Sequence, residues 1–292
     1  MLKQQATFLR DLLFNKQYSE NTIAAYKRDL LIYEDFLKTK KDLSDFYHYL
    51  TKRQLSPRSQ VRIISCVRMY FKYLQSRGVS TPDIHILKFP KLESTLPKII
   101  RIEEFRALME VSTEKQEALT LRNHLVLSFL YGLGCRVSEL IQLNLEDFNP
   151  TESWVSVTGK GNRQRLLPLT QELFTLLNKY LKEARPLLLK TETGALLMNN
   201  KGKRPSRVDI WRWLKKWSQQ AGFKEVKNPH SFRHGCATGL LEQGADLRSI
   251  QKLLGHFNIQ TTQIYTSVTS KYLKEAIDKY HPLSKSESLV ED

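Results

Sequence analysis

The stretch that decides how this chain folds, and what chemistry it can support, runs from Pro229 to Tyr265 and reads PHSFRHGCATGLLEQGADLRSIQKLLGHFNIQTTQIY. Four of its residues carry side chains that suit one reaction, namely His230, Arg233, His256 and Tyr265. Two more lie upstream in glycine-containing motifs, Arg136 in Gly-Cys-Arg-Val-Ser-Glu-Leu and Lys160 in Thr-Gly-Lys-Gly-Asn. Two arginines, a lysine, two histidines and a tyrosine suit a phosphodiester under attack by a phenol, because the cations can hold the phosphate while other groups move protons.

The chain is strongly basic. Its 292 residues carry 46 Lys and Arg against 30 Asp and Glu, which gives a formal net charge of +16 and a pI of about 9.7. A surplus of this size favours a polyanionic partner, and nucleic acid is the commonest such partner. A basic surface that serves only solubility stays open on charge alone.

Cysteine usage and hydropathy limit where the protein can work. Its three cysteines are far apart, odd in number and form no CxxC pair: Cys66, Cys135 and Cys236. No disulfide framework is therefore expected, and a reducing compartment is favoured. The first ten residues lack the layout of a signal peptide, and no apolar run approaches the roughly 20 residues that span a bilayer. The sequence predicts a cytoplasmic protein with no membrane partner.

Two prolines, Pro90 and Pro97, bracket a short polar stretch that predicts a domain boundary. We expect a smaller domain over residues 1–92, a linker over 93–98, a larger domain over 99–283 and a flexible tail over 284–292. The smaller part is the more basic per residue. It holds 17 Lys and Arg and 8 Asp and Glu (17 − 8 = +9), whereas the remainder holds 29 and 22 (29 − 22 = +7).

The smaller part is predicted to be helical throughout. Ser19 can cap one helix, and Ser56 followed by Pro57 marks the start of another that Gly78 should end. Apolar residues of the second helix share one face: Ile64, Val67, Phe71 and Leu74. Four basic residues fall within an arc of about 120° on the opposite side: Arg58, Arg62, Arg68 and Lys72. A basic helix face is usually only solvated, but opposite a packed face in so basic a chain we expect it to contact phosphates.

The larger part mixes helices with a little sheet. Residues 154–158 and 163–168 flank Gly159-Lys160-Gly161-Asn162, a pattern that predicts a β-hairpin. Helices are expected at 121–131, 171–184, 207–220 and 270–280, and in the segments around His230 and Asp246. The predicted fold is therefore mainly α with a small β-hairpin, an all-helical N-terminal domain preceding a mixed α+β domain.

Taken together, these motifs resemble those of the tyrosine recombinases, the phage integrase family, and most closely the Xer type. The resemblance runs from near Phe8 to His281-Pro282. All six active-site positions of the family are matched without substitution: Arg136, Lys160, His230, Arg233, His256 and Tyr265. Phe232 departs from the leucine that is common there, but it stays apolar and leaves the catalytic roles intact. The polar tail from Ser284 is slightly longer than expected.

The resemblance implies a role for each position. Tyr265 would be the nucleophile, forming a 3′-phosphotyrosine link that keeps the free energy of the bond available for religation. Arg136 and Arg233 would stabilise the charge that grows on the non-bridging oxygens, with Glu139 orienting Arg136. Lys160, at a glycine-flanked hairpin tip, would protonate the leaving 5′ oxygen.

The remaining positions would assist these four. His230 would be the acid–base partner of the tyrosine, and His256 would donate a hydrogen bond to the scissile phosphate. Arg163 would add a DNA contact beside the hairpin tip. No metal and no other cofactor would be needed.

The resemblance also implies how the protein acts on DNA. The two domains would form a C-shaped clamp on double-stranded DNA that carries an inverted-repeat site. Four protomers, identical or shared with a second Xer-type recombinase, would exchange strands through a Holliday junction, the helix at 270–280 docking on a neighbouring protomer. The favoured role is resolution of chromosome or plasmid dimers at cell division, with activation by an FtsK-type DNA translocase left open. An integrase or transposase of a mobile element is the nearest alternative.

Two other classes of protein fit part of these motifs, a zinc enzyme and a DNA-binding regulator. His230 and His234, with His256, could bind zinc, but the residues between the first two include no glutamate base and place Arg233 beside the supposed ligands. Residues 246–264 resemble a helix-turn-helix, which would suit a non-catalytic DNA-binding regulator. Such a regulator would not need Arg136, Lys160 and Arg233 in these contexts.

Overall fold

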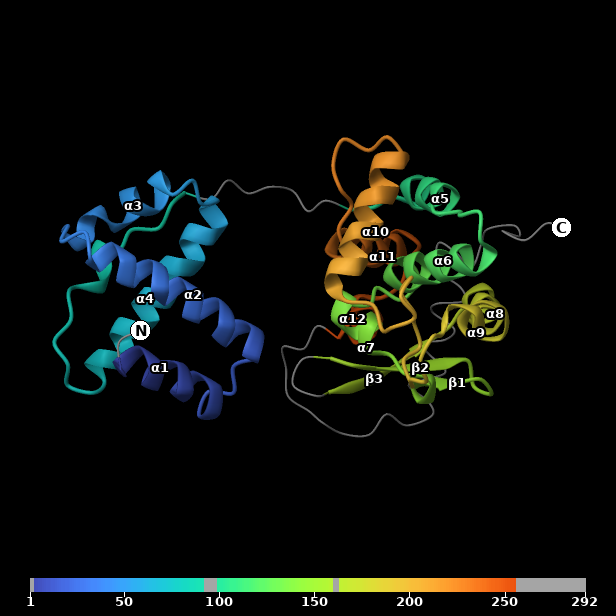
Figure 1. The fold of residues 1–292 in the computed structure, drawn as a ribbon, viewed down its shortest axis with the longest axis horizontal. Helices are drawn as coiled ribbons and strands as arrows, with labels where there is room; N and C mark the ends of the chain where they lie inside the picture. The colour runs from blue at the N-terminus through green and yellow to red at the C-terminus, as the bar shows by residue number, and fades with distance from the viewer. Residues whose placement is uncertain (1–2, 92–98, 160–162, 256–292) are drawn as a thin grey trace. The chain divides into compact units, whose positions relative to one another are not determined.

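The computed structural model describes residues 3–91, 99–159 and 163–255, and its ribbon is drawn in Figure 1. The chain divides into two compact units, residues 1–95 and 96–292. The division falls within residues 93–98, the stretch predicted as a linker. Each unit has a hydrophobic core of its own, as expected of a folding domain.

The first unit consists of helices alone, as far as residues 3–91 are concerned. They are α1 Lys3–Phe14, α2 Glu20–Leu37, α3 Phe46–Lys52 and α4 Pro57–Gln75, with 3₁₀ turns η1 Leu43–Asp45 and η2 Ile84–Ile86. Six of the sixteen buried apolar residues of its core are aromatic. The ring of Tyr33 meets Phe46 and Phe71 edge to face, with centroids 5.5 and 5.7 Å away. Such pairs add about 0.5–1.5 kcal/mol each beyond the area they bury, which helps to stabilise this small helical domain.

Helix α4 has the two faces that the sequence predicts. The Ser56 hydroxyl accepts a hydrogen bond from the Ser59 amide (3.3 Å), and Pro57 occupies the first turn. Gly78 adopts a φ of 74° shortly after the last helical residue, Gln75. The four apolar residues expected on one face are all buried: Ile64, Val67, Phe71 and Leu74. The predicted start and the predicted apolar face are confirmed.

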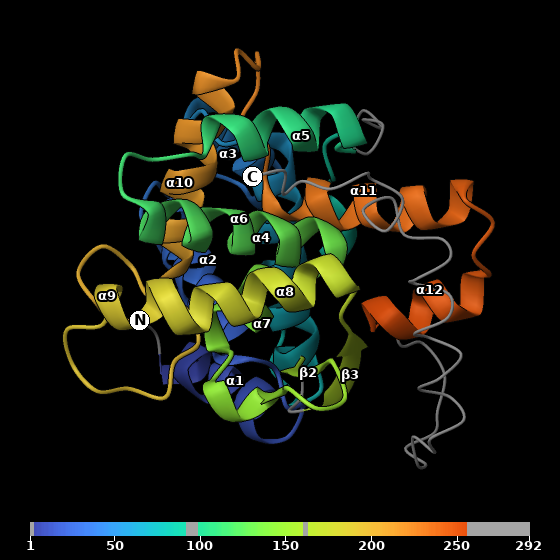
Figure 2. The same cartoon turned by 90° about the vertical axis from the view of Figure 1, so that its right-hand side faces the viewer.

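The second unit consists of helices with a small sheet at one edge, below α7 and α12 in Figure 1 and in the lower part of Figure 2. Its elements are α5 Ile102–Val111, α6 Glu117–Gly132, α7 Val137–Gln142, η3 Leu145–Asp147, β1 Phe148–Asn149, β2 Trp154–Thr158, β3 Gln164–Pro168, α8 Gln171–Lys179, the π-helical turn η4 Tyr180–Ala184, α9 Arg185–Leu188, α10 Arg207–Gln220, α11 Pro229–Glu242 and α12 Leu247–Leu254. Figure 2 shows α6 between α5 and α8, and these neighbours are in contact. Residues 125–130 of α6 are buried on every side, so α6 is the central helix of this unit.

The predicted hairpin is present, with one short strand more. Strands β2 and β3 pair antiparallel, placing Val155 opposite Leu167 and Val157 opposite Arg165, and β1 adds two residues to the other edge of β2. Val155, Val157 and Leu167 are buried, as the pleat requires of residues on one face. Arg165 lies on the same buried face, which places a charged side chain beneath the sheet.

The mainly helical fold with a small sheet, predicted from the sequence, is confirmed. The helix expected at 207–220 has those bounds, and the one expected at 171–184 is present as α8 continuing into η4. None of the described helices is both long and apolar enough to cross a bilayer. The helix predicted at 270–280 and the tail lie outside the described residues.

Candidate active site

Three of the six predicted catalytic residues are described by the structure, Arg136, His230 and Arg233. The other three, Lys160, His256 and Tyr265, lie outside the described residues. The described chain nevertheless reaches the residue before two of them, Gly159 and Gly255. The arrangement around Arg136 and Arg233 therefore includes the points at which the chain enters both segments.

Arg136 occupies the turn between α6 and α7. Gly134 makes this turn possible with a φ of 57°, and a Cβ there would lie 2.6 Å from the Leu254 side chain. Arg136 is the N-cap of α7, and its amide donates to Oε2 of Glu139 (2.8 Å). Its guanidinium Nη1 donates to Oε1 of the same carboxylate (2.7 Å). The contact expected between Arg136 and Glu139 is therefore present, and it holds Arg136 at two points.

Glu139 is shared between two arginines. Its side chain is buried, and Arg165 approaches it from β3 with Nη1 and Nη2, each 2.9 Å from one carboxylate oxygen. Burial alone would raise the pKa of Glu139, but the hydrogen bonds and charge of Arg165, followed by those of Arg136, outweigh it and lower this pKa. Glu139 is thus a carboxylate at neutral pH.

Arg233 comes to the same place from α11. Asn228 caps this helix by accepting from the amides of His230 and Ser231, and Pro229 fills its first position. The Arg233 guanidinium is buried and donates from Nη1 to the Gly134 carbonyl (2.6 Å) and from Nη2 to the Leu254 carbonyl. Burial, and then the nearby charge of Arg136, lower its pKa to about 10. Arg233 therefore keeps its charge at neutral pH.

The end of α12 is where the three arginines meet. Three successive carbonyls each accept from a different guanidinium: Leu253 from Arg165 (2.9 Å), Leu254 from Arg233 and Gly255 from Arg136 (3.3 Å). The last carbonyls of a helix have no partner within the helix and carry the negative end of its dipole, so cations are stabilising there. Gly255, in the left-handed conformation (φ 63°, ψ 44°), ends the helix one residue before His256.

The charge of this cluster is positive. Three guanidiniums and one carboxylate give 3 − 1 = +2. Arg165 and Arg233 are each only 6% exposed, whereas the side chain of Arg136 is 34% exposed. An anion arriving from solvent therefore meets Arg136 first, backed by buried positive charge. The cluster can bind a phosphate and stabilise charge that grows on it.

His230 lies one turn before Arg233 on α11 and is exposed. His234 is also exposed. Among the residues that the structure describes, no three His, Cys, Asp or Glu side chains gather as metal ligands would. His256, the third histidine of the zinc alternative, lies outside the described residues, and α12 is the described part of the supposed helix-turn-helix.

The sequence motifs do not single out Arg165. They favour Arg163, nearer the hairpin tip, whose side chain is exposed and whose carbonyl accepts from the Gly159 amide (2.8 Å). The available signal was the strand alternation, which places Arg165 on the same face as Leu167. Alternation alone could not show that Glu139 lies beneath that face.

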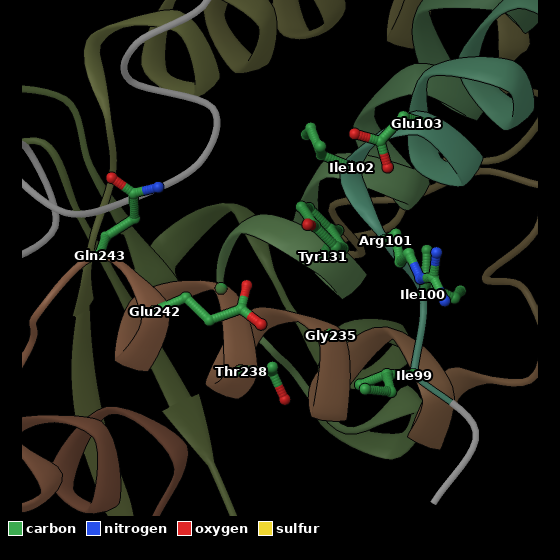
Figure 3. A pocket seen from close by; sticks show the side chains of 11 residues that line it. Ile99, Ile100, Arg101, Ile102, Glu103, Tyr131, Gly235, Thr238, Glu242 and Gln243 are labelled. Carbon is green, nitrogen blue, oxygen red and sulfur yellow. The ribbon is translucent and has the colours of Figure 1, made fainter.

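A cavity of about 300 Å³ lies elsewhere on this unit, along the C-terminal half of α11 and the start of α5 (Figure 3). In Figure 3 the ring of Tyr131 lies between the carboxylates of Glu103 and Glu242. A Cβ on Gly235 would lie 2.3 Å from the Ile100 carbonyl, so the chain before α5 rests directly on α11. None of the predicted site residues lines this cavity, and its two carboxylates carry the wrong charge for a phosphate.

In the first unit, Arg62 and Arg68, two of the four basic residues expected to contact phosphates, form hydrogen bonds that join separate parts of the unit. Arg62 donates to the buried carboxylate of Asp29 (2.5 Å). Arg68 donates from Nε and Nη2 to the Leu87 carbonyl (3.1 and 2.7 Å) and lies over the ring of Phe89. Both side chains thus help to hold the unit together. Arg58 and Lys72 are exposed, and so is Arg62, whose side chain is 43% exposed, so the four differ in whether a bond to Asp29 or Leu87 competes with a phosphate.

This difference gives a prediction for DNA binding. Replacing Arg58 and Lys72 together by glutamine should reduce the slope of log affinity against log salt by about two, because each lost phosphate contact removes about 0.9 from it. The matched pair, Arg62→Gln with Arg68→Gln, should lower the thermal midpoint more, since it removes the bonds to Asp29 and to the Leu87 carbonyl. Fluorescence anisotropy over a salt series, with thermal unfolding, measures both. An unchanged slope in the first pair would leave this helix face merely solvated.

Comparisons with known proteins identify the family. The phage integrase family matches residues 98–271, and the N-terminal SAM-like domain of phage integrases matches residues 6–78. Proteins named tyrosine recombinase XerD are similar over nearly the whole chain. The one from Listeria innocua is 37% identical and the one from Staphylococcus epidermidis 36%, each match covering 94% of this chain and 97% of the relative.

Solved structures show the same fold. XerA recombinase is 26% identical with a TM-score of 0.50, the match covering 96% of this chain and 99% of that one. XerH site-specific recombinase, in a post-cleavage complex with a palindromic difH substrate, has a TM-score of 0.67 at 24% identity, covering 88% and 79%. The family matches span both units, and the arginine cluster lies inside the larger one. The chain therefore belongs to the phage integrase family and is a site-specific tyrosine recombinase.

Proposed function

We propose that this recombinase cuts and rejoins double-stranded DNA at an inverted-repeat site and resolves chromosome or plasmid dimers at cell division. The observation that carries the chemistry is the meeting of Arg136 and Arg233 at the end of α12, with net positive charge and one guanidinium open to solvent. The similarity to XerD proteins over 94% of the chain supports the cellular role. Three free cysteines, all buried, suit the reducing cytoplasm.

In the proposed reaction, Tyr265 attacks the scissile phosphorus. A bond forms between its phenolic oxygen and phosphorus, and the bond from phosphorus to the 5′ oxygen breaks. Negative charge grows on the two non-bridging oxygens, where Arg136 and Arg233 stabilise it with donors that are already in place. The phenolic proton passes to His230, and the leaving 5′ oxygen takes a proton from Lys160. His256 donates a hydrogen bond to the phosphate.

Religation is the same reaction in reverse with a different strand. A free 5′ hydroxyl attacks the 3′-phosphotyrosine, and Tyr265 leaves as the phenol after recovering a proton. The scheme conserves the number of phosphodiester bonds, so no nucleotide cofactor is required. The arginine cluster serves both directions, because the pentacovalent transition state is the same.

The assembly and partners belong to the same proposal. We infer a clamp of the two units on DNA, and four protomers in the active complex, in which the helix predicted at 270–280 contacts a neighbour. A second Xer-type recombinase and an FtsK-type translocase are candidate partners on the Xer resemblance alone. Purified protein with two copies of an inverted-repeat site tests whether a partner is needed, since resolution without additions would exclude that need.

A nicked suicide duplex tests the chemistry. The nick lies close to the scissile phosphate, so the short 5′-hydroxyl fragment diffuses away and the covalent complex accumulates. We expect an adduct that resists detergent, forms in the presence of EDTA and disappears on protease treatment. Absence of the adduct on every candidate inverted repeat would contradict the proposed function. An adduct on mobile-element ends alone would favour the integrase alternative.

A bridging phosphorothiolate tests Lys160. Sulfur in place of the 5′ oxygen leaves without needing a proton, so it removes the need for a general acid. Lys160→Ala should therefore cleave ordinary DNA slowly, by a factor of about 10² to 10⁴, and should regain most of that loss on the phosphorothiolate. The comparison is the single-turnover rate on the two duplexes. A similar defect on both would make Lys160 a binding residue.

A further inference from the structure

We propose that Arg165 is a positioning residue for strand cleavage: it neutralises Glu139, so that the charge of Arg136 is left for the scissile phosphate. This inference rests on the phosphate-binding role proposed above for Arg136. It concerns a residue that never touches the substrate but decides how much positive charge the substrate meets.

The contacts of Arg165 leave it no free nitrogen for DNA. Its Nη1 and Nη2 form a paired interaction with the two oxygens of Glu139, and its Nε donates to the Leu253 carbonyl, all at 2.9 Å. The residue is 6% exposed. A planar guanidinium engaged at all three nitrogens is fixed in orientation. Arg165 therefore acts on the reaction through its charge and through the groups it holds, Glu139 and the end of α12, and not as a direct ligand of the phosphate.

Arg136 differs in each of these respects. It shares Oε1 of Glu139 with Arg165, its second contact to a carbonyl is the longer one at 3.3 Å, and its side chain is 34% exposed. Glu139 thus has two cationic partners, of which one is buried and one faces solvent. The buried partner can balance the carboxylate while the exposed partner binds an anion.

Loss of Arg165 would lower the net positive charge of the cluster. Arg136, Arg165 and Arg233 with Glu139 give +2, and without Arg165 the sum is +1. The carboxylate would then have Arg136 as its remaining ionic partner among the cluster. Opposite charges a few ångströms apart in a buried site interact much more strongly than in water. Arg136 would be held as a neutral pair with Glu139, and less of its charge would be available to the phosphate.

The Arg165–Glu139 pair lies close to the backbone that leads to two expected catalytic residues. A Cβ on Gly159 would lie 3.4 Å from Oε1 of Glu139, and a Cβ on Gly255 would lie 3.3 Å from the Arg165 side chain. The residues that follow these glycines are Lys160 and His256. Arg165 and Glu139 thus fill the space between the two stretches of backbone that lead to these expected catalytic residues.

Single-turnover cleavage of the nicked duplex measures the effect. Arg165→Gln should slow covalent-complex formation by about 10²-fold, the loss typical of one electrostatic contact to a transition state, while duplex affinity stays within a few-fold. Arg185→Gln is the matched control. Arg185 is also buried and donates to the Thr193 and Ala195 carbonyls, but it lies in α9, outside the cluster. That variant should lose thermal stability and keep its cleavage rate.

Two comparisons separate the charge role from a merely structural one. Adding Glu139→Gln to Arg165→Gln should raise the cleavage rate at least about 10-fold above that of Arg165→Gln, because it releases Arg136 from the unbalanced carboxylate. A methylphosphonate at the scissile position, which carries one negative charge less, should likewise shrink the defect of Arg165→Gln. A double variant no faster than the single one, or an equal defect on both substrates, would overturn the proposal.

Arg165→Lys keeps the charge and loses the paired donors. It should cleave within about 10-fold of the wild type, and it keeps the test usable if Arg165→Gln does not fold. A folded Arg165→Lys that is slower by about 10² would overturn the charge account. Arg136→Ala on the same duplex tells the two proposals apart. If it cleaves normally, the phosphate-binding role itself fails. If it fails to cleave while Arg165→Gln cleaves normally, only the inference about Arg165 is lost.

Discussion

Tyr265→Phe should form no covalent complex with the nicked duplex, while binding the intact duplex with nearly wild-type affinity. The substitution removes one oxygen, the atom that would bond to phosphorus, and leaves the ring in place. Without this oxygen the protein has no nucleophile in the family's motif context, so the expected loss is complete. Denaturing gel electrophoresis of a labelled duplex measures the adduct, and anisotropy measures binding.

The control for this prediction is Tyr47→Phe. Tyr47 lies on α3 in the first unit, is 42% exposed and is remote in sequence from the motif. Its loss of a hydroxyl should change neither the adduct nor the affinity. Wild-type adduct yield from Tyr265→Phe would remove Tyr265 from the mechanism and would require another nucleophilic side chain, which mapping the DNA-linked peptide would identify.

The second large effect is expected at Arg233. Arg233→Ala should reduce the cleavage rate by about 10² to 10³ or more, because a preorganised cation is lost from the position where charge develops. It should also lower the thermal midpoint, since the Gly134 and Leu254 carbonyls lose their donor. A buried carbonyl without a partner costs about 1–3 kcal/mol. Single-turnover cleavage and thermal unfolding measure the two effects separately.

Arg233→Lys is the informative companion. It keeps a charge at the site but offers one donor centre where the guanidinium spans two carbonyls, so it should recover little of the rate. The cleavage rate of either variant can be interpreted only if that variant is folded at the temperature of the assay. A folded Arg233→Ala that cleaves within a few-fold of the wild type would show that Arg136 suffices, and it would contradict a paired-arginine clamp.

Much of the fold was predictable because local signals decided it. Helix α4 begins at Ser56-Pro57 for reasons contained in those two residues, and its buried face follows from spacing alone. The hairpin of β2 and β3 follows from alternation around a glycine-rich turn. Strand β1 could not be predicted, because two residues carry no periodic signal and depend on pairing with β2.

The site was predictable where side-chain identity carried the signal and not where a tertiary neighbour did. The motif contexts of Arg136 and Arg233 singled them out. Arg165 was missed because its partners, Glu139 and Leu253, lie 26 and 88 residues away. Helical periodicity likewise places Arg62 on the basic side of α4. It could not show that Asp29, 33 residues earlier, pairs with the Arg62 guanidinium.

The three carbonyls at the end of α12 also have a consequence for biosynthesis. Two of these carbonyls bond arginines far away in the sequence, Gly255 with Arg136 over 119 residues and Leu253 with Arg165 over 88, and Arg233 in turn bonds Gly134 over 99. Contacts of such long sequence separation form late, because the loops between them must close first. During translation the arginines at 136 and 165 leave the ribosome well before α12 exists. An incomplete or prematurely terminated chain thus has basic residues that can bind DNA, but it lacks the assembled centre that could cut it.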